Sequence, residues 1–185
     1  TYTAKRQFFK TTSPSMDILV SSNLERLLYH VTGSDTEVAA LMKSLAETGS
    51  YTVRPETLRT IQESFACGWS SEEQVAGEIR ARFEQDGYLC DTHTAVAFHV
   101  AAQHKRDGVP MVVLSTASPF KFPRSVLEAL GQTAPANDFE AMQQLEEITG
   151  RTAPASLSAL RRKAERFNTV IDPEQIAQVA LSYQA

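Results

Sequence analysis

The stretch Met111–Arg124, with the sequence MVVLSTASPFKFPR, decides which fold the chain is expected to adopt. It opens with four apolar residues, and a short apolar run of this kind is typical of a strand buried on both faces. The run ends in the hydroxyl residues Ser115 and Thr116, and two prolines then prevent a simple continuation. Open α/β sheets bind ligands at the carboxyl ends of their strands. We therefore expect Met111–Leu114 to be a buried strand and one wall of a ligand site.

The residues in front of this stretch predict a helix that leads into it. Residues 92–106 are mostly small and apolar, which permits close packing against a sheet or another helix. The segment closes with His104, Lys105 and Arg106, where the helix dipole is negative, and Asp107 begins the turn into the strand. A helix, a turn and a buried strand in this order are typical of an α/β protein.

Hydroxyl caps and glycine stops divide the rest of the chain into further helices. Ser34 and Glu37 have the spacing of a capping box, while Gly33 and Gly49 can end helices. The predicted helices are about 16–31, 34–49, 55–66, 70–87, 123–130, 138–148, 154–167 and from 172 onward. Tyr51–Val53 is short and rich in β-formers, so it predicts an edge strand.

Length and charge exclude several classes of protein. The 185 residues fall within the usual range of one domain, and 42% apolar residues are enough for a core. A net charge of −4 and a pI near 5.6 argue against a nucleic-acid partner. No apolar run approaches the length of a membrane span, so we expect no membrane partner and a cytoplasmic location.

Metal and disulfide sites are not indicated either. Cys67 and Cys90 lie far apart and form no CxxC pair, which favours reduced thiols over a disulfide or zinc site. His99 and His104 are five positions apart, whereas helical metal ligands pair at a spacing of four, so no metal site is predicted.

Three stretches carry a resemblance to one enzyme family. Leu114–Pro123 resembles the Ser-Thr-Ala-x-Pro-x-Lys-Phe signature of threonine synthases. Ser13–Arg26 resembles the family's Ser-Pro-Ser-Met-Asp-Ile-Leu block, and Gly87–Val96 resembles its Asp-x-His-Thr-Ala-Val block. The three occur in the family's order, whereas no family motif follows Gly131.

The resemblance implies a fold and a division into domains. Threonine synthases are pyridoxal-phosphate enzymes of fold type II, similar to the tryptophan synthase β subunit, and this chain would be a helix-rich part with few strands. Residues 1–131 would belong to the catalytic domain and residues 132–185 would form a carboxyl-terminal helical extension. The chain opens at Thr1, without an initiator Met, on a block that lies in the second half of family members. We therefore expect a carboxyl-terminal portion whose missing amino-terminal part supplies the Schiff-base lysine and the glycine-rich phosphate loop.

Thr116 and Ser115 are the candidate cofactor residues. In the family the Thr of this motif is taken to face the pyridine nitrogen of pyridoxal 5'-phosphate, and a threonine hydroxyl can donate to that nitrogen without supplying a charge. The alternative is that the hydroxyl caps the next turn. Ser118 stands where some family members have His, so it has at most a lining role. Lys121 lies in a different context from the Schiff-base lysine, and a solvated or ion-paired side chain is its expected role.

The candidate substrate residues come from the other two blocks. They are Ser15, Asn23, Arg26, His93 and Thr94. Arg26 could bind a carboxylate or phosphate through its guanidinium, but a surface ion pair with Glu25 or Asp35 is the alternative. His93 at a helix start suits a neutral donor, although a structural histidine or a simple cap at Asp91 or Thr92 is the alternative.

Two functions follow from these observations. The resemblance implies that the whole enzyme converts O-phospho-L-homoserine and water to L-threonine and phosphate in threonine biosynthesis. The chain alone would then be inactive, and no residue of it is predicted to be catalytic by itself. The alternative is a non-catalytic helical module that derives from the enzyme and acts by self-association.

Overall fold

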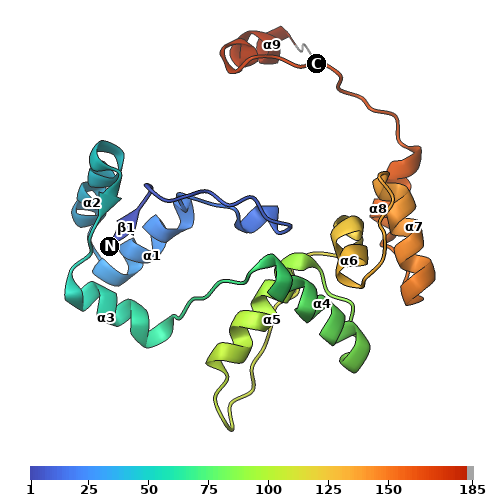
Figure 1. Ribbon diagram of the computed structural model, residues 1–185. Coiled ribbons are helices and arrows are strands. Elements are labelled where there is room, and N and C mark those ends of the chain that lie inside the picture. Colours follow the sequence, from blue (N-terminus) through green and yellow to red (C-terminus); the bar gives the residue numbers. More distant parts are fainter. Residues whose placement is uncertain (183–185) are drawn as a thin grey trace. The chain divides into compact units, whose positions relative to one another are not determined.

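The computed structural model describes residues 1–182 and divides into two compact units, Thr1–Ala153 and a second unit that begins at Pro154 (Figure 1). Secondary structure in the first unit comprises β1 (Tyr2–Thr3), a 3-10 helix at Pro14–Met16, α1 (Ser22–Thr32), α2 (Asp35–Thr48), β2 (Ser50–Tyr51), α3 (Pro55–Ser64), α4 (Glu72–Asp86), α5 (Thr92–His104), a 3-10 helix at Pro119–Lys121, α6 (Pro123–Ala129) and α7 (Asp138–Thr149). The second unit contains α8 (Ala155–Ser158), 3-10 helices at Ala159–Arg162 and Pro173–Gln175, and α9 (Ile176–Ser182).

The first three helices pack around a small core beside a two-stranded antiparallel sheet. β1 pairs with β2 so that Tyr2 faces Tyr51, and their rings stack with centroids 5.2 Å apart. Leu28 of α1 and Val38 of α2 are buried against Tyr51. A strand thus forms near the predicted Tyr51–Val53, but it is Ser50–Tyr51 and shares only Tyr51 with the prediction.

The helices from α4 to α7 form the second part of the first unit. α4 packs against α5 and α6, and α6 packs against α7. Their buried residues include Ile79, Leu127 and Leu145. The guanidinium of Arg80 donates two hydrogen bonds to the carbonyl of Ala129, at 3.1 and 2.9 Å, and so closes the carboxyl end of α6.

The predicted and observed helix ends agree where a capping residue or a glycine determines them. Ser34 accepts a hydrogen bond from the N–H of Glu37 at 3.1 Å, as the capping-box spacing predicts. Gly33 and Gly49 end α1 and α2 in the left-handed conformation, with φ of 65° and 79°. That conformation is costly for a residue with a Cβ.

The buried strand predicted at Met111–Leu114 is wrong. The segment is extended but forms no ladder with any of residues 1–182, and Val112 and Leu114 are 76% and 75% exposed. Figure 1 shows it as a plain trace between α5 and the 3-10 helix at Pro119. A strand exists only when a neighbour pairs with its N–H and C=O groups, and apolar sequence alone cannot supply that neighbour.

Two predicted helices are shorter than expected. The helix predicted at about 16–31 begins only at Ser22, because the carboxylate of Asp17 accepts hydrogen bonds from the N–H and hydroxyl of Thr11, at 2.8 and 2.7 Å, and holds a turn instead. The helix predicted at 154–167 ends at Arg162 as α8 and one 3-10 turn. Residues 154–182 bury no large side chain, so the apolar face of this helix has no core there to stabilise it.

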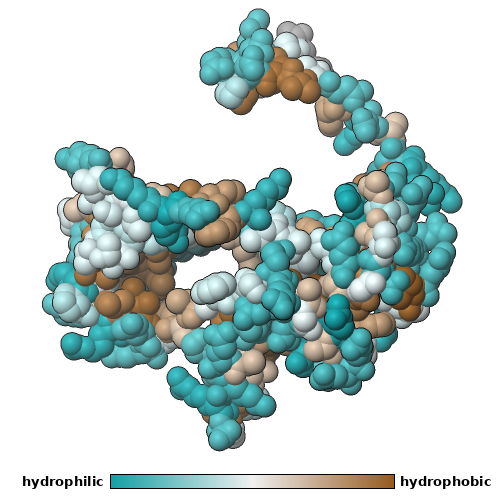
Figure 2. Space-filling model, in the orientation of Figure 1, coloured by the Kyte–Doolittle hydropathy of each residue, from teal (hydrophilic) through white to brown (hydrophobic). Residues whose placement is uncertain are grey.

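Apolar side chains also remain at the surface elsewhere. In the second unit Ile176 and Leu181 of α9 are 58% and 82% exposed, and Figure 2 shows hydrophobic atoms on the surface of this segment. Residues 1–182 include no helix that is both long enough and apolar enough to cross a membrane.

Candidate functional site

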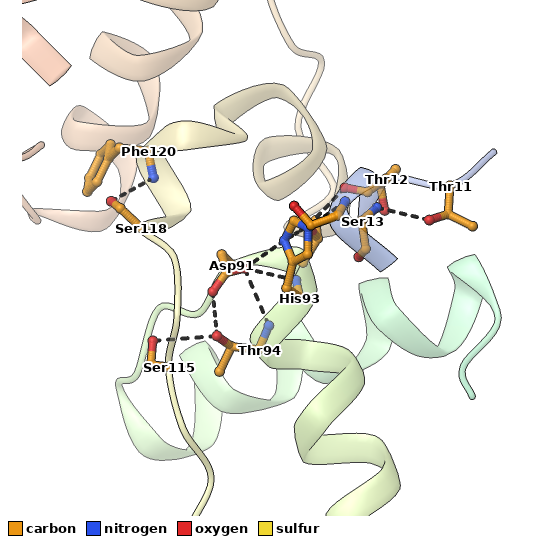
Figure 3. Close-up of polar contacts among 11 residues, drawn as sticks. Thr11, Thr12, Ser13, Asp91, His93, Thr94, Ser115, Ser118 and Phe120 are labelled. Atoms are coloured by element: carbon orange, nitrogen blue, oxygen red, sulfur yellow. Dashed lines mark hydrogen bonds and ion pairs between the residues drawn. The ribbon is translucent and has the colours of Figure 1, made fainter. Parts of the chain in front are cut away.

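The three sequence blocks singled out above meet at the amino-terminal end of α5 (Figure 3). The hydroxyl of Thr92 donates to the carbonyl of Thr12 at 2.9 Å, and the N–H of Ser15 donates to Nε2 of His93 at 3.3 Å. The hydroxyl oxygens of Thr94 and Ser115 lie 3.5 Å apart. These contacts join residues that are up to eighty positions apart in the sequence.

Asp91 holds this end of the helix. Its Oδ1 accepts from the N–H groups of His93 and Thr94, at 2.9 and 3.3 Å, which is the geometry of a helix cap. Its Oδ2 accepts from the hydroxyl of Thr94. The carboxylate is fully buried, so these donors replace the water that it loses.

His93 takes a definite hydrogen-bonding state in this arrangement. Its Nδ1 lies 3.1 Å from Oδ1 of Asp91, which only accepts, so we assign the ring proton to Nδ1. Nε2 is then free to accept from Ser15. The ring is 6% exposed and lies against Phe122, with centroids 4.9 Å apart, so the third block closes over it.

A turn formed by residues 11–17 covers the other side of the histidine. The N–H of Thr11 donates to Asp17, as does its hydroxyl, and these bonds hold the pKa of the Asp17 carboxyl below its ordinary value. Ser13 within this turn is 2% exposed, and its hydroxyl has no hydrogen-bond partner among residues 1–182. A buried hydroxyl without a partner is uncommon and marks the inner wall of the turn as a polar surface.

The structure places the candidate cofactor residues at the edge of this cluster. Ser115 is exposed but approaches Thr94, whereas Thr116 is exposed and makes no side-chain hydrogen bond within residues 1–182. Ser118 accepts from the N–H of Phe120 at 3.3 Å and so caps a 3-10 turn. Lys121 is exposed, and its ammonium lies 5.4 Å from the centre of the Phe122 ring.

Two of the candidate substrate residues lie elsewhere. Asn23 and Arg26 are exposed on α1 and have no contact with the cluster among the side-chain hydrogen bonds of residues 1–182. Arg26 lines a groove of about 420 Å³ between α1 and α2, together with the acidic residues Glu25 and Asp35. No ion pair of Arg26 with either carboxylate forms within the described residues, so the predicted surface pair is absent there.

Two residues of the cluster were not predicted as site residues. Asp91 was interpreted only as a possible cap, although an Asp two positions before a His at a helix start can also bind the imidazole. Nothing in the local sequence predicts that Ser13 is buried, because its burial depends on α5, which comes from a distant part of the chain. Within residues 1–182 no three or more His, Cys, Asp or Glu side chains gather as metal ligands.

Comparison with known proteins agrees with the three blocks. The family model for the carboxyl-terminal region of threonine synthase matches residues 94–180. The threonine synthase of Pseudomonas aeruginosa is 35% identical over 170 residues, which cover 90% of this chain and 32% of that protein. The chain belongs to the threonine synthase family. The threonine synthase of Methylobacillus glycogenes is 36% identical over 126 residues, covering 66% of this chain and 26% of the relative.

A solved structure extends this agreement to the fold. The pyridoxal-phosphate-bound threonine synthase from Brucella melitensis superposes with a TM-score of 0.77 at 35% identity, covering 95% of this chain and 34% of that one. The predicted fold class is confirmed: the chain is a helix-rich part of a threonine synthase of fold type II, with few strands among its described residues. The chain spans about a third of the length of this structure and of the Pseudomonas relative.

Proposed function

We propose that the chain forms the carboxyl-terminal part of a pyridoxal-phosphate-dependent threonine synthase, which converts O-phospho-L-homoserine and water to L-threonine and phosphate. The observation that carries the proposal is the meeting of the three family blocks at the start of α5, where Ser15 and Phe122 contact His93. There Ser115 also approaches Thr94. A non-catalytic packing role would not require polar residues from all three blocks to converge on one helix end. The rest of the site would come from the amino-terminal part of the enzyme.

The hydroxyl residues after Leu114 could bind pyridoxal phosphate at one side of its ring. The hydroxyl of Thr116 is exposed and has no protein partner among residues 1–182, so its proton is available to a ring nitrogen. A hydroxyl brings no charge, and it therefore stabilises the unprotonated form of the nitrogen. When bound, the cofactor withdraws electrons from the substrate's α-carbon and lowers the barrier to proton removal. Ser115 would bind the cofactor beside Thr116. Its contact with Thr94 would hold residues 115–116 against the start of α5.

The substrate side would be formed by the cluster on α5. We assign Ser15, His93 and Thr94 to it, because the structure brings these three together. Their roles would be to shape the wall of the site and to keep water away from the reacting carbons. Asn23 and Arg26 remain predictions, with the guanidinium of Arg26 as the candidate partner of the substrate's phosphate or carboxylate.

The segment Met111–Leu114 fits a place within the larger enzyme. It is extended and apolar, and its backbone groups have no ladder partner within residues 1–182. We propose that the amino-terminal part of the full-length enzyme covers the exposed apolar side chains of this segment. This contact would fix the position of Ser115 and Thr116 directly after it.

The test uses the full-length enzyme and a matched pair of substitutions. Thr116→Val keeps the shape of the side chain but removes the hydroxyl, whereas Thr116→Ser keeps the hydroxyl. We expect Thr116→Val to lower the rate of phosphate release from O-phospho-L-homoserine and to change the absorption spectrum of the bound cofactor, with Thr116→Ser close to the unsubstituted enzyme. Equal rates and spectra in all three proteins would contradict the assignment of Thr116.

A second experiment addresses the chain by itself. We expect the 185-residue chain with added pyridoxal phosphate to release no phosphate from O-phospho-L-homoserine, because the predicted Schiff-base lysine lies outside it. Turnover above the rate of free cofactor would contradict this expectation.

The alternative function, self-association, has one observation in its favour. Exposed apolar side chains on an unpaired extended segment are typical of surfaces that pair with another chain. Sedimentation of the chain distinguishes the two functions: a defined, soluble dimer favours a free-standing module, whereas a monomer that joins the amino-terminal part of the enzyme favours the synthase.

A further inference from the structure

We propose that Lys121 is an anion-binding residue, whose ammonium group binds a phosphate monoester at the edge of the cluster around His93. The inference rests on the proposed function, which brings two phosphate monoesters to the site, one on O-phospho-L-homoserine and one on pyridoxal 5'-phosphate. It adds to that function a cationic group of this chain that meets the negative charge of the ligand.

The backbone of Lys121 is held in place on both sides. Its N–H donates to the carbonyl of Ser118 at 3.0 Å, within the 3-10 turn. The residue before it, Phe120, is 4% exposed, and Pro123 two positions after it is buried at the start of α6. Only the side chain of Lys121 is therefore free to move, and its ammonium stays within one side-chain length of this anchored turn.

The ring of Phe122 places that ammonium beside the cluster. The Lys121 ammonium lies 5.4 Å from the centre of the Phe122 ring, within the range of a cation–π contact. The same ring lies against the imidazole of His93, with centroids 4.9 Å apart. One aromatic ring thus contacts both groups, which puts a positive charge at the border of the cluster.

Lys121 has no negatively charged partner within the described part of the chain. Its side chain is exposed, and no ion pair of Lys121 forms among residues 1–182. An anion that binds the ammonium therefore replaces water and breaks no ion pair of the protein.

An anionic ligand needs such a positive charge at this place. The cluster carries two carboxylates, those of Asp91 and Asp17, and like charges repel at close range. His93 does not offset them, because its ring is neutral in the assigned state, with Nδ1 as a donor and Nε2 as an acceptor. The hydroxyls of the cluster bring no charge at all.

Two other cations near the first sequence block already face carboxylates. The pKa of Asp17 is lowered first by its bonds from Thr11 and further by the nearby charge of Lys10, so Lys10 acts on that carboxylate. Arg26 shares its groove on α1 and α2 with two acidic residues. Lys121 differs from both, since its ammonium meets an aromatic ring and solvent.

Lysine labelling of the full-length protein is the first test, and it does not depend on turnover. The holoenzyme is acetylated with N-hydroxysuccinimide acetate in inorganic phosphate and in sodium chloride of equal ionic strength, and the cofactor-free protein is acetylated in the chloride. Mass spectrometry of peptides gives the rate at Lys121. The exposed Lys105, which follows the other end of α5, is the internal control and should react equally in all three samples.

The three samples also distinguish the two sources of phosphate. Slower acetylation of Lys121 in the holoenzyme only when inorganic phosphate is added assigns it to the substrate's phosphate. Slow acetylation in the holoenzyme in chloride, with recovery after the cofactor is removed, assigns it to the cofactor's phosphate. Equal acetylation of Lys121 in all three samples would overturn the proposal.

Substitutions of the full-length enzyme are the second test. Lys121→Met removes the charge and keeps the length of the side chain, Lys121→Arg keeps the charge, and Lys105→Met is the matched control. Loss of one hydrogen bond to a charged group weakens binding by about 10- to 100-fold. We expect Lys121→Met to raise, by that factor, either KM for O-phospho-L-homoserine with a smaller change in kcat, or the dissociation constant of pyridoxal phosphate. Lys121→Arg should keep most of the affinity.

Two results of these measurements would overturn the proposal. One is a Lys121→Met enzyme whose KM and cofactor affinity are both unchanged, and the other is an equal loss in Lys105→Met. If the unsubstituted enzyme releases no phosphate from O-phospho-L-homoserine, the proposed function fails. The labelling with inorganic phosphate then still decides whether Lys121 binds an anion.

Discussion

The N–H of Ser15 donates to Nε2 of His93 across 3.3 Å, although the two residues are separated by 78 positions. This contact joins the first sequence block to the second. It also depends on the tautomer of the imidazole, since only an unprotonated Nε2 can accept. The bond therefore gives a direct measure of whether the cluster is assembled.

Two substitutions of His93 should separate its two contacts. In His93→Gln the amide oxygen can reach the place of Nε2 and accept from Ser15, whereas in His93→Asn the shorter side chain reaches only toward Asp91. One hydrogen bond contributes about 1 kcal/mol, so His93→Asn should speed exchange of the Ser15 amide by about fivefold while His93→Gln has little effect. Amide exchange followed by NMR measures this. Equal protection in the two variants would show that the Ser15 contact does not hold the turn.

The two cysteines should differ in reactivity and in their effect on alkaline stability. Burial raises the pKa of Cys90 to about 12, whereas Cys67 is exposed. At pH 8 a thiol reagent should therefore modify Cys67 alone in the folded chain, and both cysteines after denaturation. Cys67→Ser is the control, since it should leave no reactive thiol in the native protein.

Alkaline unfolding follows from the same pKa. The value for folded Cys90 lies above the 9.0 of an ordinary cysteine, so the folded state binds the thiol proton more tightly. The contribution of Cys90 to stability is complete below pH 9.0 and is lost as pH rises toward 12. Denaturant unfolding from pH 8 to 11 should show this loss, and Cys90→Ala should show a smaller one.

A pair of leucines tests the core between α1, α2 and β2. Leu28 is 1% exposed and Leu58 is 43% exposed. Leu28→Ala should lower the free energy of unfolding by about 2–5 kcal/mol, because it removes buried methyl groups and leaves a cavity. Leu58→Ala should have a small effect. Thermal or denaturant unfolding measures both, and similar losses at the two sites would mean that this core is not formed in solution.

Two glycines should respond to alanine in opposite directions. A Cβ on Gly68 would lie 2.9 Å from Cγ1 of Val100, whereas a Cβ on Gly77 within α4 would meet nothing within 4 Å. Gly68→Ala should cost about 1–3 kcal/mol of stability through overpacking. Gly77→Ala should add about 0.5–1 kcal/mol, because alanine is the better helix former. The same unfolding measurements compare the two variants, and a stabilising Gly68→Ala would contradict the close approach to α5.

Local chemistry explains which parts of the fold the sequence could predict. The predicted carboxyl ends of α1 and α2 and the predicted start of α2 are correct. Gly33 and Gly49 end these helices and Ser34 caps α2, and each acts within one turn of its own position. The prediction of a strand at Met111–Leu114 is wrong, because a strand needs a second strand to pair with, and the local sequence does not show whether one is present. The late start of α1 has a similar cause, since the bond of Asp17 to Thr11 competes with the helix.

The site was predictable only in part, for a related reason. The blocks that contain Ser15, His93 and Ser115 could be recognised from their residues, but their contacts could not, because each contact joins two distant segments. The burial of Asp91 likewise depends on what packs over the start of α5. Asn23 belongs to a recognised block, yet the start of α1 at Ser22 places it on an exposed surface.

The buried carboxylate of Asp91 has a consequence for the evolution of the family. A buried carboxylate that accepts from two N–H groups, an imidazole and a hydroxyl cannot be replaced alone without leaving one of these donors unpaired in a dry interior. Lineages that replace Asp91 are therefore expected to replace His93 and Thr94 as well, and an alignment of many relatives should show these three positions changing as a group.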